Sequence, residues 1–327
     1  MYNTTMNEDR KGETKLRASR GQKARIGLYA LIIALLLLAI VLSLALQAEP
    51  IRCENRLSEK LPIPVPTELN DGKGVLTLVM LDVGQGDSLL LISPSGKTML
   101  IDAGEEEAFS AVDSALAAYG IRRIDAVVAT HSHADHIGGM ADVLRDYPVG
   151  TFYMTDFSAT TPTYKRMLRM LRKNGCAVYR TDAETEIAWD DAVSVEVLNP
   201  IPEQVYEDAN NASIVLKVTY GDVSLLLTGD AEAKTEMLLV GAYGAEKLKA
   251  DVLKLGHHGS RSSSCAAFLN AVGAKYALAS LGKDNDYGHP HESVLNRLAA
   301  RGMTLYRTDE SGCVAVFTDG TRVCVVP

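Results

Sequence analysis

Apolar positions along the chain occur in short runs separated by glycine-rich turns and amphipathic stretches. The segments "VLTLVMLDV", "SLLLISP" and "TMLIDAG" open this pattern near Gly74 and predict three strands. From there to the C-terminus, predicted strands and predicted helices alternate, and we find no internal repeat. This interleaving indicates a layered α/β domain rather than a β-sandwich or a helical bundle.

The other elements are predicted in the same way, from the helical or strand spacing of their apolar positions. Helices are predicted over residues 108–119, 137–146, 161–175 and 231–249, near Ala266 and after Pro290. Strands are predicted over residues 125–129, 214–219, 223–228, 251–256 and 276–281, and around Phe152, Val178 and Val195. A hairpin over residues 313–326 closes the chain.

An uncharged apolar run at residues 26–48 is long enough to cross a bilayer as one helix. Lys and Arg residues crowd the sequence before it and Glu49 follows it, so the positive-inside rule predicts a basic cytoplasmic tail at residues 1–25. The length of the run favours an uncleaved signal anchor over a cleaved signal peptide, although Ser43-Leu44-Ala45 fits a cleavage site.

The segment 49–73 contains four prolines and predicts an extended linker, with a globular domain over residues 74–327. We therefore expect a single-pass protein of the cell membrane whose globular domain is extracytoplasmic. If the apolar run is removed as a signal peptide, the domain is instead secreted.

The formal net charge of the chain is −8, although its first 25 residues are basic. An acidic body argues against broad nonspecific nucleic-acid binding but leaves room for a local basic groove. One basic helix is predicted, "YKRMLRMLRKNG", with Lys165, Arg166, Arg169, Arg172 and Lys173. A solvated helix face is the simpler interpretation of these cations, and a patch that guides a nucleic-acid strand is the alternative.

The five cysteines are scattered and predict neither a disulfide framework nor a zinc knuckle. Cys313 and Cys324 flank the predicted hairpin, where a tight turn would place them diagonally, a poor geometry for a disulfide.

All seven histidines fall in three places, each of which precedes a predicted helix: 131/133/136, 257/258 and 289/291. Functional sites in open α/β sheets gather at the carboxyl ends of strands, so three such loops can converge on one site.

The stretch "ATHSHADHIGG" carries the clearest chemistry. On an extended backbone, the side chains of His131 and His133 point the same way and can hold one cation. Asp135 and His136 can then reach a second cation as the chain turns into a helix. Imidazole and carboxylate ligands suit zinc, manganese or iron. The alternative is a solvated polar loop in which Asp135 caps the helix.

This stretch resembles the HxHxDH motif of the metallo-β-lactamase superfamily. The resemblance implies that Asp102, from "LIDAG", supports the loop, and that Asp230, from "LLLTGDA", bridges two metals. It further implies a last ligand from "LKLGHHGS", for which we take His257 over His258 by a narrow margin. The alternative for Asp230 is a helix cap.

Within that superfamily, the sequence is similar to the extracytoplasmic hydrolase domain of ComEC-type DNA-uptake proteins. The similarity covers about residues 75–325 and rests on "LDVGQGDS", "HSHADHIGG", "NNASIVL", "LLTGDA", "LKLGHHGS" and "YGHPH". It implies a four-layer αββα sandwich with two divalent metal ions, zinc or manganese. A competence channel protein on another chain is then an expected partner.

The sequence departs from the broader superfamily at one ligand. No histidine lies between His136 and His257, and Ala209, Asn210 and Asn211 occupy that region. We therefore expect the first metal site to be weak: His131, His133 and Asp230, completed by water or Asn211. The second site should be tighter, with Asp135, His136, Asp230 and His257.

Further roles are predicted around the two metals. His258 and His289 are candidate catalytic residues that contact the phosphate or the leaving oxygen, and His291 is expected to cap a helix. The loop "DVGQGDS" is expected to form a structural turn; the alternative is that Asp87 or Gln85 hydrogen-bonds to the metal-ligand loops. Candidate substrate-binding residues are Asn211, Ser213 and Ser260.

The expected reaction is metal-assisted hydrolysis of a phosphodiester, and the resemblance alone indicates DNA as the substrate. Two alternatives stay open. One is a hydrolase of another substrate, such as a wall phosphodiester, a lactone or a β-lactam. The other is a metal-binding module without turnover that docks to a DNA-uptake channel.

Overall fold

The structure is a computed structural model that describes residues 61–66, 69 and 74–327. The predicted tail at residues 1–25, the anchor at 26–48 and most of the linker at 49–73 lie outside the described residues. Among the residues that are described, no helix combines the length and the apolar character needed to span a membrane.

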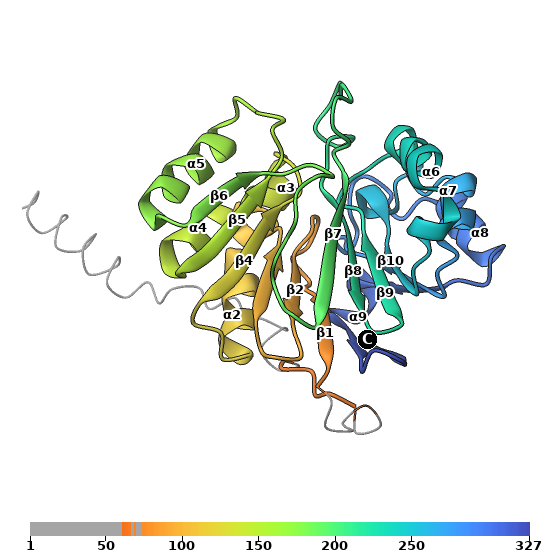
Figure 1. Cartoon of the computed structure of the whole chain (residues 1–327), viewed down its shortest axis with the longest axis horizontal. Coiled ribbons are helices and arrows are strands. Elements are labelled where there is room, and N and C mark those ends of the chain that lie inside the picture. The colour runs from red at the N-terminus through yellow and green to blue at the C-terminus, as the bar shows by residue number, and fades with distance from the viewer. Residues whose placement is uncertain (1–60, 67–68, 70–73) are drawn as a thin grey trace, which may run out of the picture. The chain divides into compact units, whose positions relative to one another are not determined.

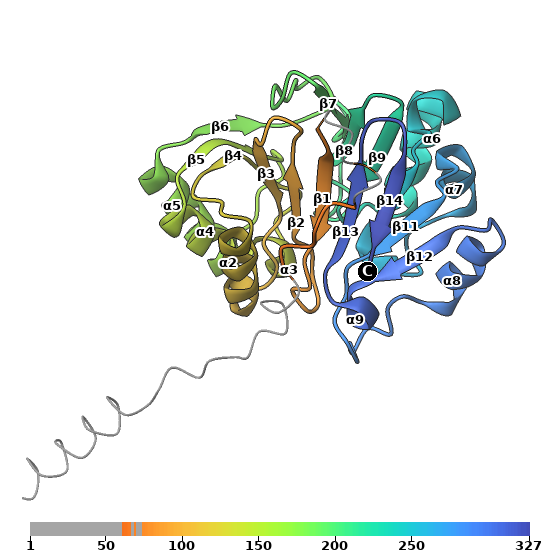
Figure 2. The same cartoon turned by 90° about the horizontal axis from the view of Figure 1, so that it is seen from below.

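Two β-sheets form the centre of the domain (Figures 1 and 2). The first has the strand order β14-β13-β1-β2-β3-β4-β5-β6 and the second the order β12-β11-β10-β9-β8-β7. The strands of the first sheet are β1 Leu76–Met80, β2 Leu89–Ile92, β3 Thr98–Ile101, β4 Ile124–Ala129, β5 Val149–Met154, β6 Ala177–Arg180, β13 Val314–Thr318 and β14 Val323–Val326. Those of the second are β7 Val193–Asn199, β8 Val215–Tyr220, β9 Val223–Leu227, β10 Val252–Lys254, β11 Tyr276–Ala279 and β12 Thr304–Arg307.

Helices cover the outer face of each sheet (Figures 1 and 2). On the first sheet they are η2 Glu106–Ala108, α2 Phe109–Ala118, α3 Ala134–Ile137, α4 Met140–Asp146 and α5 Pro162–Asn174. The later helices are α6 Ala233–Leu248, η3 Gly256–Gly259, α7 Ala266–Val272, α8 Glu292–Ala299 and α9 Thr308–Ser311.

Three buried apolar clusters hold these layers together, because successive side chains of a strand point to opposite faces. In β1, Leu78 packs in the cluster between the sheets and Val79 in the cluster under the first helices. A third cluster joins the second sheet to its own helices, as Leu253 and Phe268 do. The layers therefore follow the αββα order that the sequence predicts.

Two local predictions are wrong. Instead of one helix over residues 137–146, the chain forms α3, breaks at Gly138-Gly139 and continues as α4. The break accompanies a close approach of two backbones, since a Cβ atom on Gly138 would lie 2.3 Å from the backbone nitrogen of Glu106. The edge strand β12, a half-exposed segment of four residues, was not predicted.

The C-terminal hairpin is confirmed, and Cys324 pairs with Phe317 across it. Cys313 lies before the first strand of the hairpin, and neither cysteine takes part in a disulfide.

The basic helix α5 buries Tyr164, Met167 and Leu171. Its Arg166 pairs with Asp142 at 2.8 Å and with Glu106, so this cation is already neutralised within the fold. Lys165 and the cations after Arg166 remain exposed, as expected for a solvated face.

Substitution of Phe152, on β5, tests how much the apolar cluster under the first helices contributes to stability. Its side chain is fully buried, so Phe152→Ala should lower the free energy of unfolding by about 3–5 kcal/mol, measured by denaturant titration. The control is Val205→Ala, because Val205 is 79% exposed, and it should change stability by less than about 0.5 kcal/mol. Similar small losses for both variants would contradict this account of the core.

Candidate metal centre and active site

The carboxyl ends of several strands deliver the predicted site residues. Asp102 follows β3 directly, and His131 follows the neighbouring parallel strand β4. In the second sheet, Asp230 follows β9 and the pair His257-His258 follows its parallel neighbour β10. The two sheets therefore bring residues far apart in the sequence to one place, as expected at the carboxyl ends of parallel strands.

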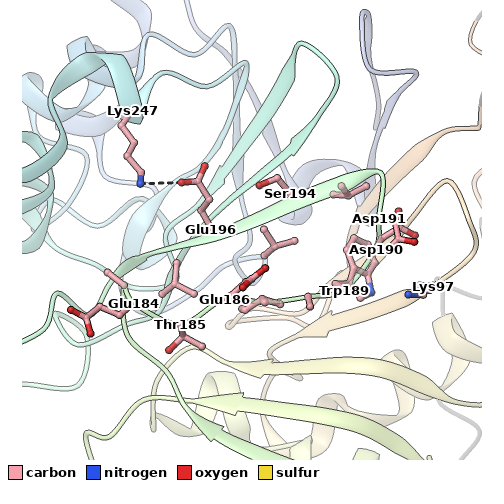
Figure 3. Close-up of a pocket in the computed structure, with 16 residues that line it drawn as sticks. Lys97, Glu184, Thr185, Glu186, Trp189, Asp190, Asp191, Ser194, Glu196 and Lys247 are labelled. Atoms are coloured by element: carbon pink, nitrogen blue, oxygen red, sulfur yellow. Dashed lines mark ion pairs between the residues drawn. The ribbon is translucent and has the colours of Figure 1, made fainter.

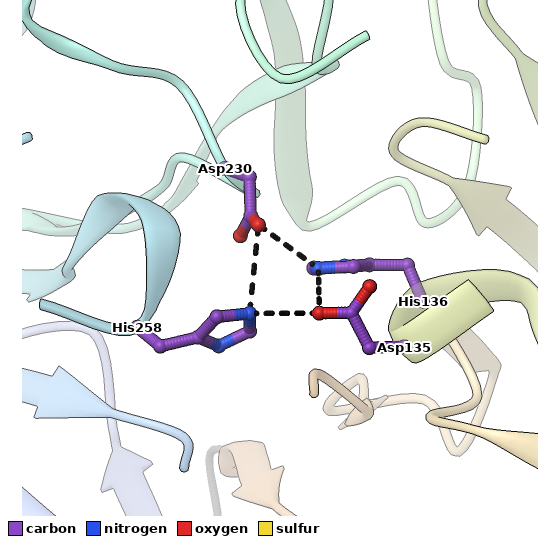
Figure 4. Close-up of side chains that lie close together, drawn as sticks. All are labelled: Asp135, His136, Asp230 and His258. Atoms are coloured by element: carbon purple, nitrogen blue, oxygen red, sulfur yellow. Dashed lines mark hydrogen bonds and ion pairs between the residues drawn. The ribbon is translucent and has the colours of Figure 1, made fainter. Parts of the chain in front are cut away.

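Four side chains form a compact group: Asp135, His136, Asp230 and His258. One ligand atom from each lies within 4.8 Å of the others, and Figure 4 shows the side chains pointing toward one another. Asp230 Oδ2 is 3.3 Å from His136 Nε2 and 3.5 Å from His258 Nε2. His258 Nε2 is also 3.2 Å from Asp135 Oδ2.

The bonding of this group fits a divalent cation. His136 Nε2 and Asp230 Oδ1 are buried and have no hydrogen-bond partner, and the same is true of the neighbouring His131 Nε2. A buried polar atom without a partner costs free energy that a bound cation would recover. Imidazole nitrogen and carboxylate oxygen are the ligands that zinc and manganese accept.

The histidine rings are held by bonds on their far sides. His136 Nδ1 donates to Asp102 Oδ2 at 2.7 Å, and Asp102 accepts two further bonds from Thr130. His258 Nδ1 donates to the Ser280 carbonyl at 2.8 Å. Both bonds leave Nε2 directed into the group, which is the arrangement that fixes metal-ligating histidines.

The electrostatics favour cation binding. Burial lowers the pKa of His131 well below its ordinary value, so the ring is neutral with a lone pair available. Burial would raise the pKa of Asp230, but His136 and His258 beside it hold that pKa well below its usual range. Burial works against protonation of His136 and His258, yet the surrounding carboxylates raise the pKa of both rings, so a cation would displace protons there.

The expected first site is less complete. The rings of His131 and His133 lie edge to face with centroids 4.7 Å apart, and His131 Nε2 is 3.9 Å from Asp230 Oδ2. His133 is exposed. These two histidines therefore adjoin the compact group without belonging to it.

Comparison with known proteins agrees with this geometry. A model of the metallo-beta-lactamase superfamily matches residues 81–283, more than half of the 327 residues. The chain belongs to this superfamily. Its αββα sandwich is the fold that this membership implies, and the histidine and aspartate group lies where the matched motifs meet.

Two curated proteins are similar to most of the globular domain. Competence protein ComA of Neisseria gonorrhoeae is 40% identical over 234 residues, which cover 71% of this chain and 31% of that protein. ComE operon protein 3 of Bacillus subtilis is 32% identical over 253 residues, which cover 72% of this chain and 32% of that protein. The chain thus spans about a third of the length of these relatives.

Among solved structures, CmlA, a diiron β-hydroxylase from Streptomyces venezuelae, has a similar fold. The TM-score is 0.51 at 15% identity, over 77% of this chain and 54% of that chain.

In this superfamily member, the geometry favours His258 for the ligand position that the sequence assigned to His257. The His258 side chain is buried within the group, whereas that of His257 is 27% exposed. His257 Nε2 is 3.9 Å from Asp230 Oδ2, and its Nδ1 is 3.0 Å from Glu232 Oε1. Both histidines have positive φ, 46° and 54°, so the chain turns sharply and the two side chains diverge.

The helix-cap alternatives do not describe the two aspartates. His133 occupies the N-cap position of α3, and Asp135 lies one residue inside that helix. Glu232 occupies the N-cap position of α6, two residues after Asp230. Both carboxylates are thereby left to face the group.

Two predicted substrate-binding residues support the fold instead. The Asn211 side chain bonds to Asp208 at 2.9 Å and to Thr235 at 3.0 Å, so it is engaged between a loop and α6. Ser213 is fully buried, and its Oγ accepts a bond from the backbone nitrogen of Asp230 at 3.1 Å. Ser213 therefore supports the backbone of Asp230 from the side away from the group.

The other predicted residues lie at the rim. The His289 ring is 5.7 Å from the His257 ring and 6.2 Å from the His258 ring, and its buried Nδ1 has no hydrogen-bond partner. Ser260 Oγ accepts a bond from Ser262 Oγ at 3.0 Å. His291 is the N-cap residue of α8, and its Nδ1 accepts a bond from the backbone nitrogen of Arg261 rather than from the helix.

The loop "DVGQGDS" packs directly against the ligand loops. The backbone nitrogen of Asp87 donates to the Asp135 carbonyl at 3.1 Å, and Gln85 Oε1 accepts from the backbone nitrogen of Gly282 at 3.3 Å. At Gly86, where φ is 131°, a Cβ atom would lie 2.2 Å from the Asp135 carbonyl oxygen. The loop thus combines the structural turn with the supporting role.

Lys254 is a further residue of the site that was not predicted from the sequence. This β10 residue is fully buried, forms an ion pair with Asp87, and its Nζ is 3.3 Å from the Gly229 carbonyl. Although burial would raise the pKa of Asp87, Lys254 and His258 lower it. A single lysine inside the apolar strand "DVLKLG" was the available signal, because lysine is almost never fully buried unless it is paired.

A separate cavity of about 680 Å³ lies along β7 and is lined by Trp189, Glu196 and Lys247, among others (Figure 3). Its lining includes none of the histidines, and Lys247 pairs with Glu196 at 3.0 Å. The ligand chemistry, and not the size of a cavity, locates the candidate active site.

Gly86 and Gly84 form a matched pair for testing the loop. Both have positive φ, but a Cβ atom on Gly84 would meet nothing within 4 Å. Gly84→Ala should therefore cost only the backbone strain, about 1–2 kcal/mol. Gly86→Ala should cost clearly more and weaken metal binding about 10–100-fold, because it displaces Asp135. Denaturant titration and calorimetric metal titration measure the two effects; equal losses for both variants would contradict the contact.

Lys254→Met should lower the free energy of unfolding by about 3–5 kcal/mol, because it leaves the Asp87 carboxylate buried without its cation. Adding Asp87→Asn should restore part of that loss, as measured by urea unfolding. Lys275→Met, which changes an exposed lysine, is the control and should have little effect. If the double variant is no more stable than Lys254→Met, Lys254 does not act by neutralising Asp87.

Proposed function

We propose that this superfamily member is a metal-dependent phosphodiesterase that cleaves DNA. The observation that carries the proposal is the compact group of two carboxylates and two imidazoles with buried, unpartnered ligand atoms. The names of the similar proteins, which include Competence protein ComA of Neisseria gonorrhoeae and Recombination protein 2 of Haemophilus influenzae, support DNA as the substrate.

The side chains have distinct tasks in this proposal. Divalent cations supply charge neutralisation on the phosphate oxygens and lower the pKa of water for attack. Asp230 is within 3.9 Å of histidines on both sides, so it sets the spacing between the two cation positions. Asp102 keeps His136 oriented through the bond at Nδ1.

Two histidines at the mouth complete the machinery. His257 donates from Nδ1 to Glu232 Oε1 at 3.0 Å, which leaves its Nε2, 3.9 Å from Asp230 Oδ2, with a lone pair to accept a hydrogen bond at the mouth. His289 has an unpartnered buried Nδ1 and lies beside both His257 and His258. Burial, together with the neighbouring His258, lowers the pKa of His289 to about 4, so both rings are placed to accept a proton from the attacking water rather than to supply one.

We further propose that the domain acts outside the cytoplasm, attached to the cell membrane by residues 26–48, or is secreted if that run is cleaved. The apolar run and the basic residues before it support this location. A competence channel protein on another chain is the proposed partner, in keeping with the competence proteins among the relatives.

One observation favours a second candidate function, a metal-binding partner of a DNA-uptake channel without turnover. The first site has only His131 and His133 beside Asp230, and the side chain of Asn211, the residue expected to complete it, is engaged with Asp208 and Thr235. A site that lacks a ligand can bind its metal too weakly for catalysis.

The test is cleavage of labelled single- and double-stranded DNA by the purified protein with manganese, zinc or a chelator. We expect cleavage that requires metal and that falls more than about a hundredfold in Asp230→Ala, since loss of even a supporting residue costs 10–100-fold. Asp222→Ala, which removes an exposed carboxylate from the turn between β8 and β9, is the matched control and should retain activity.

The result can separate the two candidates. If no metal supports cleavage while Asp230→Ala still lowers metal stoichiometry, measured by elemental analysis, the nuclease proposal is rejected and the non-catalytic partner is favoured.

A further inference from the structure

An exposed aromatic ring stands at the mouth of the metal centre. Tyr287 is 64% exposed, although aromatic side chains usually contribute to protein cores. Its ring stacks on the ring of His289, with centroids 5.6 Å apart and an interplanar angle of 21°. The His289 ring is in turn 6.2 Å from that of His258, which belongs to the compact group. Tyr287 is therefore two ring contacts away from a candidate metal ligand.

The loop that carries Tyr287 is held in place by Asn285. The side-chain nitrogen of Asn285 donates to the carbonyls of Gly282 and His289, at 3.0 and 2.9 Å. Its side-chain oxygen accepts from the backbone nitrogen of His289 at 2.9 Å. Because these bonds close the loop on itself, the exposed ring has a fixed position and loses little conformational entropy when a ligand binds.

A cation lies on the same side of the mouth. Arg261 is exposed, and its Nε is 3.1 Å from His291 Nε2. The His291 ring is 5.0 Å from that of His289. An aromatic face and a guanidinium thus flank His289, which is the combination by which proteins bind single-stranded nucleic acids: bases stack on the ring and a phosphate pairs with the cation.

We propose that Tyr287 is a stacking platform for an unpaired nucleobase next to the phosphate being cleaved, and that Arg261 binds a neighbouring phosphate. The proposal rests on the proposed phosphodiesterase function and narrows its substrate to single-stranded nucleic acid. In a duplex, both faces of each internal base are already stacked, so the platform has no free face to bind. A wall polymer without aromatic rings would gain nothing from Tyr287.

The experiment compares two single-stranded oligonucleotides of equal length, one with bases and one with abasic residues around the cleaved phosphate. Tyr287→Ala should raise KM for the oligonucleotide with bases about 5–100-fold, the range expected for loss of one base–aromatic stack, and should leave kcat within about twofold. On the abasic oligonucleotide, the KM and kcat of Tyr287→Ala should equal those of the unsubstituted protein. Tyr287→Phe should retain the low KM for the oligonucleotide with bases, because a phenyl ring can still stack on a base.

Two further variants sharpen the result. Arg261→Gln should raise KM for both oligonucleotides and reduce the slope of log affinity against log salt by about one. Tyr179→Ala, on the edge strand β6, changes another exposed tyrosine that stacks on Tyr153, and it should leave both substrates unaffected.

Equal losses on both oligonucleotides with Tyr287→Ala would overturn the proposal, since Tyr287 would then only hold His289 in place. No loss on either oligonucleotide would also overturn it. If the unsubstituted protein cleaves only double-stranded DNA, the proposal is overturned and the phosphodiesterase function stands. If it cleaves neither these oligonucleotides nor double-stranded DNA, the phosphodiesterase function fails, and fluorescence anisotropy with the same oligonucleotides tests stacking on Tyr287 separately. Tighter binding of the oligonucleotide with bases, lost in Tyr287→Ala, would support stacking on Tyr287. Equal binding of the two oligonucleotides would overturn the proposal.

Discussion

The buried carboxylate of Asp230 is the point at which the two halves of the domain meet. It is 1% exposed and lies within 4 Å of His131 and His136, which follow strand β4, and of His258, which follows β10. The group of Asp135, His136, Asp230 and His258 takes two residues from each half of the domain. The packing of the two sheets against each other, through the apolar cluster between them, therefore determines the geometry of the metal centre.

Burial of several charged groups in one place requires compensation, and the surrounding elements supply it. Lys254 neutralises Asp87 beneath the centre, and Asp87 in turn is 3.4 Å from His258 Nδ1. Ser213 and Thr130 bind the backbone of Asp230 and the carboxylate of Asp102, respectively. These contacts bind the polar atoms that point away from the centre, so the atoms that point into the centre stay available for a cation. Such outer hydrogen bonds are what orient the ligands of metal sites in proteins.

The sequence predicts the parts of this arrangement that are local. His131 to His136 form one contiguous motif, and strand periodicity places Asp102 and Asp230 at strand ends. The choice between His257 and His258 could not be made, because it depends on two consecutive residues with positive φ, which no periodicity reveals. The hydrogen bonds of Asn211 and Ser213 could not be predicted for a related reason: their partners, Asp208, Thr235 and the backbone of Asp230, are set by how loops pack. The role of Lys254 could not be predicted, because its ion-pair partner, Asp87, is 167 positions away in the sequence.

The two halves of the centre differ in how firmly their ligands are held, and this difference bears on catalysis. In the second site, His136 and His258 are buried and each is fixed through its Nδ1. In the first site, His133 is exposed and a third histidine is missing. A structural metal site is closed by protein ligands, whereas a catalytic one keeps a position open for water or substrate. The side of the centre beside His131 and His133 is therefore the decisive one: in the proposed hydrolase the substrate would have to supply a ligand there, and in the non-catalytic alternative that metal would be bound too weakly for catalysis.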